Sequence, residues 1–280
     1  MKEIDSKSKT LYISDLDGTL LNKNAELSQY AKDALNRKFL GEIYFSVATA
    51  RTAASAFVIL DGIRWNMPVI LLNGVLIYDF SEKRYVQELP IPSQAVAAIA
   101  AVLRRLETTG LMYQMQNNEQ LTYYETMEHK PTRDFIDERI VRYKKKFYKT
   151  TCFSDVPAEG IIYFTLIDTQ DKLQTVYEEL TKIPDISLSM YKDIYNVNLW
   201  YLEIHNDRAS KQNATEFLKK TYGFERIIGF GDNLNDLPLF AACDVKVAVE
   251  NANEEVKNAA DFICDTNEND GVIKWIEKNA

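Results

Sequence analysis

The stretch that decides the fold is TLYISDLDGTL, Thr10–Leu20. Its first half is apolar and rich in strand-forming residues, which indicates a buried β-strand, and Gly18 and Thr19 mark the turn that follows. Two aspartates, Asp15 and Asp17, stand at the end of that strand. Because residues two apart on a strand point to the same side, both carboxylates are predicted to face one site.

Strand and helix patterns alternate after this stretch. Apolar strand patterns recur at EIYFSVAT and MPVILLNG, each preceded by a helical pattern, and the same alternation returns from SKQNATEFLKKTYG to GVIKWIEKN. Continuous apolar strands between helices are typical of a parallel sheet that is covered on both faces. We therefore predict an α/β fold with a doubly wound, mostly parallel, Rossmann-like core.

The middle of the chain breaks the alternation. A hairpin pattern around Ser81–Lys83 leads into a region that carries its own helix, strand–turn–strand and apolar strand patterns. We predict that residues 86–197 form an inserted α+β cap domain that determines substrate specificity. The core is then built from residues 1–85 and 198–280.

Composition excludes several classes of protein. The chain has 280 residues and a net charge of -8, which argues against a nucleic-acid binder because such proteins need a basic surface. Its three cysteines are far apart, which indicates reduced side chains. We see no signal sequence at the N-terminus and no apolar run near the roughly 18 residues of a membrane span. We expect a cytoplasmic monomer or small homo-oligomer without membrane or nucleic-acid partners.

One basic run needs a separate interpretation. RIVRYKKKFYKT, Arg139–Thr150, mixes basic and aromatic residues. A solvated helix face is the favoured reading, and a basic surface that attracts a phosphorylated substrate is the main alternative. A nucleic-acid patch is disfavoured because the run is short and the chain is acidic.

Polar side chains are predicted to gather at one edge of the core sheet. In an open parallel sheet, ligands bind beyond the carboxyl ends of the strands. The residues that stand at such strand ends, or on the helices next to them, are Asp15, Asp17, Thr49, Lys211, Asp232, Asn235 and Asp236.

The aspartates of this group point to a metal ion. At 4 Å, a like-charged pair repels by about 4 kcal/mol at an effective dielectric of 20, so the cluster needs a cation. Its donor atoms are hard oxygens, which suit Mg²⁺. We therefore predict a Mg²⁺ site among the four carboxylates of Asp15, Asp17, Asp232 and Asp236.

The same residues suit phosphoryl transfer. One carboxylate of the Asp15–Asp17 pair can attack phosphorus, while the other protonates the leaving oxygen and then deprotonates water. The spacing alone leaves open which of the two attacks. Thr49 and Lys211 supply a hydroxyl and an ammonium group for the phosphoryl oxygens, and Asn235 supplies a neutral amide that orients the ligand.

These residues resemble the haloacid dehalogenase superfamily of phosphohydrolases. DLDGTL, SVATAR, the lysine of RASKQNA and GDNLND are similar to its four motifs, in the same order. ILLNG, followed by a hairpin and a long insert, resembles the Cof-type branch, in which an α/β cap follows the third core strand. Two departures stand out: Thr49-Ala50-Arg51 replaces a common TGR, and DRASKQ lacks the two glycines common before and after the lysine.

The resemblance implies a role for each residue. Asp15 would be the nucleophile and a Mg²⁺ ligand, and Asp17 the acid/base, with its backbone carbonyl on the metal. Asp232 would bind Mg²⁺ directly, supported by Asp236 and Asn235. Two further residues are predicted substrate contacts, Arg51 and Asn73, although Asn73-Gly74 also suits a simple turn.

The sequence thus predicts a Mg²⁺-dependent phosphatase of small phosphorylated metabolites, such as a sugar phosphate, a nucleotide or a phosphorylated cofactor. One alternative is a phosphotransferase or phosphomutase, in which the phosphoryl group passes to a second hydroxyl. Another is a sensor that binds a phosphorylated metabolite without turnover. The physiological substrate and the cap residues that select it are left open.

Overall fold

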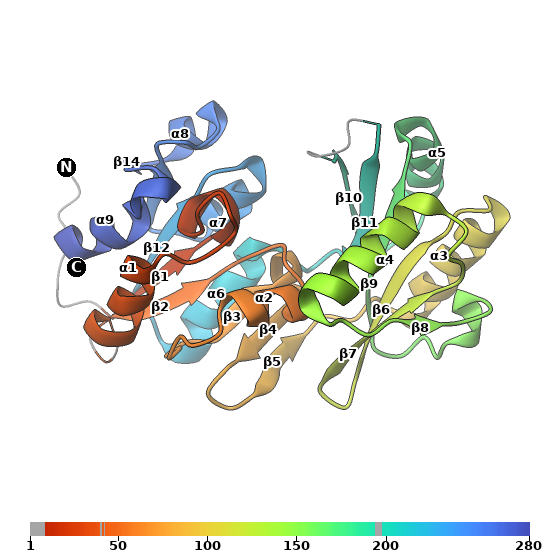
Figure 1. Cartoon of the computed structure of the whole chain (residues 1–280), viewed down its shortest axis with the longest axis horizontal. Coiled ribbons are helices and arrows are strands. Elements are labelled where there is room, and N and C mark those ends of the chain that lie inside the picture. Colours follow the sequence, from red (N-terminus) through yellow and green to blue (C-terminus); the bar gives the residue numbers. More distant parts are fainter. Residues whose placement is uncertain (1–8, 40, 42, 194–197) are drawn as a thin grey trace. The chain divides into compact units, whose positions relative to one another are not determined.

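A computed structural model describes residues 9–39, 41, 43–193 and 198–280. The chain divides into two compact units, one formed by Met1–Gln87 with Ser210–Ala280 and the other by Glu88–Ala209 (Figure 1). Residues 1–8, where we expect no signal sequence, lie outside the described part, as do residues 194–197 beside the predicted boundary at 197/198. The domain boundaries at 85/86 and 197/198 stay predictions.

The first unit is built on a five-stranded sheet in which every recorded pair of strands is parallel. The strand order is β14-β13-β12-β1-β2, so the first strand of the chain lies between β12 and β2. The strands are β1 (Thr10–Ser14), β2 (Tyr44–Val47), β12 (Arg226–Gly231), β13 (Val245–Val249) and β14 (Phe262–Cys264). The chain therefore runs outward from β1 in both directions, which places a topological switch point beside β1.

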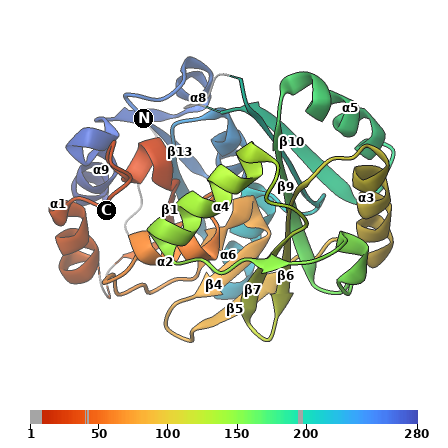
Figure 2. The ribbon, with the colours of Figure 1, turned by 45° about the vertical axis from the view of Figure 1, so that its right-hand side comes forward.

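Helices cover both faces of this sheet (Figures 1 and 2). Ile227 of β12 shares a core cluster with Leu218 and Leu239, whereas the ring of Phe230 on the same strand meets Trp275 edge to face at 5.4 Å. Since Ile227 and Phe230 point to opposite faces, the predicted doubly wound core is confirmed. The helices are α1 (Gln29–Asp33), α2 (Ala53–Ile59), α6 (Lys211–Tyr222), α7 (Leu237–Ala241), α8 (Glu254–Ala259) and α9 (Gly271–Asn279).

The predicted third core strand is shorter than its apolar pattern suggested. It forms β3 (Val69–Leu71), which pairs antiparallel with β4 (Leu76–Asp79) and is linked to the parallel sheet by an isolated bridge between Ala48 and Ile70. The strand ends early because Leu72 and Asn73 have positive φ angles of 48° and 52°, which turn the chain back. The predicted hairpin follows as β4 and β5 (Arg84–Glu88).

The second unit contains a six-stranded sheet of order β10-β11-β9-β6-β7-β8. Its strands are β6 (Gly110–Gln116), β7 (Glu119–Tyr124), β8 (Tyr148–Lys149), β9 (Ile161–Asp168), β10 (Ile186–Lys192) and β11 (Trp200–Asn206). Its helices are α3 (Ser93–Arg105), α4 (Lys130–Tyr143) and α5 (Gln170–Leu180). Most neighbouring strands are antiparallel, which agrees with the α+β pattern of the insert.

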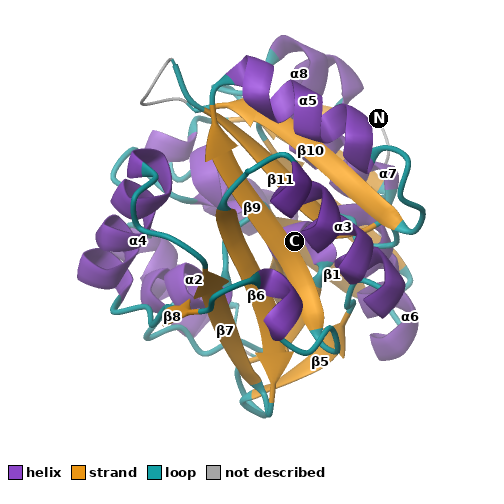
Figure 3. Ribbon diagram, turned by 90° about the vertical axis from the view of Figure 1, so that its right-hand side faces the viewer, coloured by secondary structure: helices purple, strands orange, loops and turns teal. Residues whose placement is uncertain are grey.

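One face of this second sheet forms an apolar core. Ile99 of α3 and Leu173 of α5 are fully buried in one cluster with Phe164 of β9 and Leu202 of β11. Figure 3 shows α3 and α5 lying over the strands on this side. Among the residues that the structure describes, no helix in either unit is long and apolar enough to span a membrane.

Candidate active site

The carboxyl ends of β1 and β12 bring the two acidic motifs together. These strands pair in parallel with Ser14 opposite Phe230, and the backbone N–H of Asp15 donates a hydrogen bond to the Phe230 carbonyl at 3.0 Å. Asp15 and Asp232 therefore directly follow the carboxyl ends of two neighbouring strands. This is the edge at which the sequence predicted a site.

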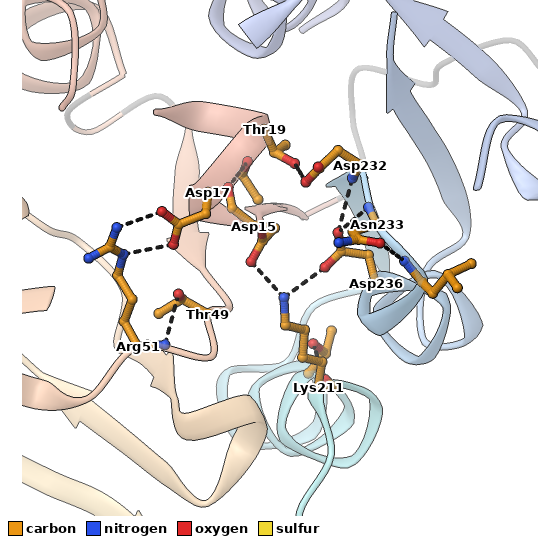
Figure 4. Close-up of polar contacts among 12 residues, drawn as sticks. Asp15, Asp17, Thr19, Thr49, Arg51, Lys211, Asp232, Asn233 and Asp236 are labelled. Carbon is orange, nitrogen blue, oxygen red and sulfur yellow. Dashed lines mark hydrogen bonds and ion pairs between the residues drawn. The ribbon is translucent and has the colours of Figure 1, made fainter. Parts of the chain in front are cut away.

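The turn after β1 is shaped to fit Asp232. Gly18 adopts a φ of 77°, and a Cβ atom at this position would lie 2.4 Å from Oδ2 of Asp232. The Thr19 hydroxyl donates a hydrogen bond to the other oxygen, Oδ1, at 2.7 Å (Figure 4). Asn251 also donates to the Gly18 carbonyl at 2.7 Å. The sequence analysis did not identify Thr19 and Asn251 as site residues, because neither residue type by itself indicates a hydrogen bond to Asp232 or to the Gly18 turn.

Lys211 links two of the aspartates. It is the first residue of α6, whose N-terminus is capped by the Ser210 hydroxyl, and its side chain is 1% exposed. Its Nζ donates to Oδ1 of Asp15 at 2.6 Å and to Oδ1 of Asp236 at 2.7 Å (Figure 4). Although burial favours the neutral amine, the two carboxylates raise the pKa of Lys211 above its ordinary value.

Both carboxylate oxygens of Asp236 are already engaged. Oδ1 accepts from Lys211, and Oδ2 accepts from the backbone N–H groups of Asp232 at 3.0 Å and Asn233 at 3.1 Å. Its side chain is fully buried, and a Cβ on Gly231 would lie 2.6 Å from the Asp236 Cβ. The geometry suits a residue that holds the turn and Lys211 in place, and the predicted part of Asp236 in metal binding stays a prediction.

Asp17 pairs with Arg51 and is not one of the three aspartates whose oxygens lie within 4.8 Å of one another. Nε of Arg51 donates to Oδ2 at 2.7 Å and Nη2 donates to Oδ1 at 2.5 Å, in a two-point contact (Figure 4). The Asp17 side chain remains 51% exposed. The sequence predicted Arg51 as a substrate contact and did not foresee this pair, although opposite charges at neighbouring strand ends are a usable signal.

Thr49 and Asn73 lie on two loops that hydrogen-bond to each other. The backbone N–H of Asn73 donates to the Thr49 carbonyl at 2.9 Å, and the Thr49 hydroxyl accepts from the Arg51 N–H at 3.1 Å. Thr49 is 1% exposed, and Oδ1 of Asn73 is buried without a hydrogen bond in the described part of the chain. Asn235 is exposed on the turn Leu234–Asp236. The phosphate and substrate roles of these three residues stay predictions.

The electrostatics of the cluster favour a bound cation. Burial and the neighbouring Asp236 carboxylate raise the pKa of Asp15 well above its usual range, against the opposing effect of Lys211. Burial likewise raises the pKa of Asp232 to about 6. One oxygen from each of Asp15, Asp232 and Asp236 lies within 4.8 Å of the others. Hard oxygen donors this close together suit a divalent cation such as Mg²⁺.

The comparison with known protein families shows to which family the chain belongs. The family model of haloacid dehalogenase-like hydrolases matches residues 12–276, which include both acidic motifs and Lys211. The chain belongs to this family. The superfamily and fold predicted from the motifs are therefore confirmed, and so is the prediction of a hydrolase.

Named relatives of this hydrolase are phosphatases. The chain is 24% identical to 5-amino-6-(5-phospho-D-ribitylamino)uracil phosphatase YcsE of Bacillus subtilis, over 98% of this chain and 96% of that protein. It is 21% identical to pyridoxal phosphate phosphatase YbhA of Escherichia coli, over 94% and 95%. The crystal structure of TM0651 from Thermotoga maritima superposes with a TM-score of 0.78 at 27% identity and covers 96% of this chain and 97% of that one.

Proposed function

We propose that this hydrolase is a Mg²⁺-dependent phosphatase that cleaves phosphate monoesters of small metabolites through an aspartyl-phosphate on Asp15. The observation that carries the proposal is the position of the Asp15 carboxylate. It is buried at the end of β1, Lys211 holds one of its oxygens at 2.6 Å, and the Asp232 carboxylate lies nearby. The second oxygen of Asp15 accepts no hydrogen bond within the described residues, so it is available to a metal or to phosphorus.

Mg²⁺ fits the donor set that the chain provides. Asp15 and Asp232 would hold it, because each keeps one carboxylate oxygen outside the hydrogen bonds seen among the described residues. Asp236 would act through Lys211 and the backbone of the turn. When bound, the ion offsets negative charge on the carboxylates and on the phosphoryl oxygens.

The reaction is then a double displacement at phosphorus. A carboxylate oxygen of Asp15 forms a bond to phosphorus while the bond to the leaving oxygen breaks, and Asp17 donates a proton to that oxygen. Water next attacks phosphorus, gives its proton to Asp17, and the bond to Asp15 breaks to release inorganic phosphate. Lys211, Thr49 and Asn235 hold the phosphoryl oxygens.

The substrate class rests on the relatives. YcsE is named for a phosphorylated uracil derivative and YbhA for pyridoxal phosphate, both phosphate esters of small molecules. We place this chain's substrate in that broad class. We also propose that the unit Glu88–Ala209 provides the residues that select among such substrates.

Replacement of the nucleophile tests the proposal. In Asp15→Asn, kcat with an aryl phosphate should fall about a thousandfold or more, because an amide oxygen cannot form the acyl phosphate. The control is Asp33→Asn, an isosteric change of an exposed aspartate on α1, which should keep the wild-type rate. Phosphate release in Mg²⁺ buffer measures both.

Trapping the intermediate adds a second readout. Rapid acid quench of the wild-type enzyme should leave phosphate on a peptide that contains Asp15. Free inorganic phosphate as the product identifies hydrolysis, whereas a phosphorylated second hydroxyl identifies transfer. Full activity of Asp15→Asn would reject the assigned nucleophile.

A further inference from the structure

The second unit contains a sheet face that is buried and polar. Thr122, Tyr113, Tyr163 and His205 are cross-strand neighbours on β7, β6, β9 and β11, so their side chains form a row on one face. All four are at most 5% exposed. The opposite face carries the apolar core beneath α3 and α5. Polar groups buried in this way are normally matched with partners.

Lys145 lies against this row without a matching acceptor. It belongs to the basic run Arg139–Thr150, and its neighbours Lys144 and Lys146 are exposed as the favoured reading of that run expects. Lys145 itself is only 9% exposed. Its Nζ lies 4.5 Å from the centre of the Tyr113 ring and has no hydrogen-bond partner in the described part of the chain.

Two more unmatched donors lie on the same face. Thr122 is directly opposite Tyr113, and Gln120 precedes it by two residues on β7, so both point to the side of Tyr113. The Thr122 hydroxyl and the Gln120 Nε2 are buried and have no hydrogen-bond partner among the described residues. Unused donors of Lys145 and Thr122 thus lie beside Tyr113, and that of Gln120 lies on the same sheet face, opposite Met115.

Lys145 is a buried lysine whose Nζ has no acceptor among the described residues. A buried ammonium without a carboxylate is unfavourable, and burial together with the Arg139 charge lowers the pKa of Lys145 to about 7. Cation–π contacts with Tyr113 and Phe147, at 4.5 and 5.3 Å, offset only part of this cost. A ligand that brings negative charge and acceptor oxygens would satisfy the unused donors together.

We propose that Lys145, Thr122 and Gln120 form a binding site for the oxyanionic group, a carboxylate or a phosphate, of a small molecule. This group is either a second anionic group of a substrate, besides the phosphate that is hydrolysed, or belongs to a separate metabolite. The first source rests on the proposed phosphatase function. The second source does not depend on it.

Direct observation of Lys145 tests the site in the wild-type protein. The Nζ resonance, assigned by its loss in Lys145→Met, is titrated with pH in Mg²⁺-free buffer, alone and with malonate or inorganic phosphate. Either anion should raise the pKa of Lys145 by about one unit or more, since an opposite charge at contact favours the ammonium. An unchanged pKa with both anions would overturn the proposal, because a lysine held only by aromatic rings has no reason to respond.

Kinetics identify the source of the anion. Glycerol 3-phosphate and 3-phosphoglycerate serve as a matched pair, since only the second carries a carboxylate. Lys145→Met should lower kcat/KM for 3-phosphoglycerate about tenfold relative to glycerol 3-phosphate, and Lys146→Met, the exposed neighbour, should leave this ratio unchanged.

The Lys145 titration and the kinetic comparison can give different results, and each combination has a different meaning. An anion response of Lys145 with an unchanged substrate ratio supports the site and assigns it to a separate metabolite. An anion response without turnover of either ester supports the site and counts against the proposed function. A uniform loss for both substrates in Lys145→Met, with no anion response, would show a purely structural lysine and overturn the site.

Discussion

Single residues at the ends of β1 and β12 are held by several partners at once. Asp232 accepts from Thr19 and lies against Gly18, and Asp15 accepts from Lys211. A side chain held in this way loses little further conformational freedom when a ligand binds. The predictions at this scale therefore concern the space and the charge around the carboxylates.

Gly18→Ala should damage the site through one methyl group. The alanine would have to keep the φ of 77°, which is strained for a residue with a side chain. Its Cβ would lie 2.4 Å from Asp232 Oδ2, so Asp232 must move. We expect a stability loss of about 1–2 kcal/mol from the backbone and a further loss of Mg²⁺ affinity and kcat/KM. Urea unfolding and Mg²⁺-dependent phosphate release measure the two effects.

Gly62→Ala is the matched control for that change. Gly62 has nearly the same φ, 78°, but a Cβ there would meet nothing within 4 Å. It should show the same backbone cost and unchanged Mg²⁺ affinity. Equal kinetic damage in both variants would contradict the claimed fit between Gly18 and Asp232.

The raised pKa of Asp232 predicts pH-dependent metal binding. With a folded pKa of about 6 against an ordinary value of 3.8, the folded protein binds more protons than the unfolded chain between these values. Without metal, stability is therefore lost as pH rises from about 4 to about 6. Mg²⁺ needs the ionised carboxylate, so its apparent affinity should be about tenfold weaker at pH 5 than at pH 7.

Thermal melts across a Mg²⁺ titration at each pH provide the measurement. The increase in Tm should be small at pH 5 and larger at pH 7, and Asp232→Asn should abolish it at both. The same Mg²⁺ response at both pH values would show that Asp232 does not control metal binding.

At the scale of elements, α6 sets the position of Lys211. The helix begins where the Ser210 hydroxyl accepts a hydrogen bond from the Asn213 N–H at 3.0 Å, and Lys211 is its first residue. Gly74, in the turn after β3, packs against this start, since a Cβ there would lie 2.2 Å from the Ser210 carbonyl oxygen. The early end of β3 and the start of α6 are thus fitted to each other.

Ser210→Ala should therefore affect stability and activity together. Loss of the cap costs about 1 kcal/mol and frees the first turn, so Lys211 holds Asp15 less firmly and kcat/KM falls several-fold. Ser28→Ala removes the cap of α1, where the hydroxyl accepts from the Ala31 N–H and also donates to Asp270. It should lower stability at least as much without lowering kcat/KM. If kcat/KM fell in both variants in proportion to their loss of stability, the role of Ser210 in positioning Lys211 would be refuted.

At the scale of the whole molecule, the two units should respond differently to metal. The site residues all belong to Met1–Gln87 and Ser210–Ala280, whereas Glu88–Ala209 has a core of its own. Mg²⁺ should slow hydrogen exchange in the first unit and leave the core strands of the second unchanged. Exchange measured by mass spectrometry on the intact protein tests this.

Strand β11 is the informative segment in that experiment. The sequence assigned residues 198–209 to the catalytic core, whereas Trp200–Asn206 pairs with β9 and β10 in the six-stranded sheet. Peptides from β11 should therefore behave like those of β9. Protection of β11 by Mg²⁺ together with β12 would favour the boundary predicted from the sequence.

The local patterns were enough to predict the core and to place both acidic motifs at one edge of it. Alternating apolar strands and helices predicted the parallel sheet, and the spacing of the acidic residues placed Asp15 and Asp232 at its carboxyl edge. These features depend on periodicity and strand direction, which are properties of short segments. The same reasoning extended β3 too far, because a positive φ at Leu72 is not signalled by an apolar side chain.

Only the tertiary structure decided how these groups pair. The sequence by itself determined the family, the fold class and the meeting of Asp15 with Asp232, because adjacent parallel strands end together. It did not predict that Arg51 pairs with Asp17, or that the oxygens of Asp236 bind Lys211 and the backbone of the turn. Nor did it predict that Lys145 is buried although its neighbours in the basic run are exposed. Those outcomes depend on contacts between segments far apart in the chain, where distance and burial, and not residue type, determine the partner.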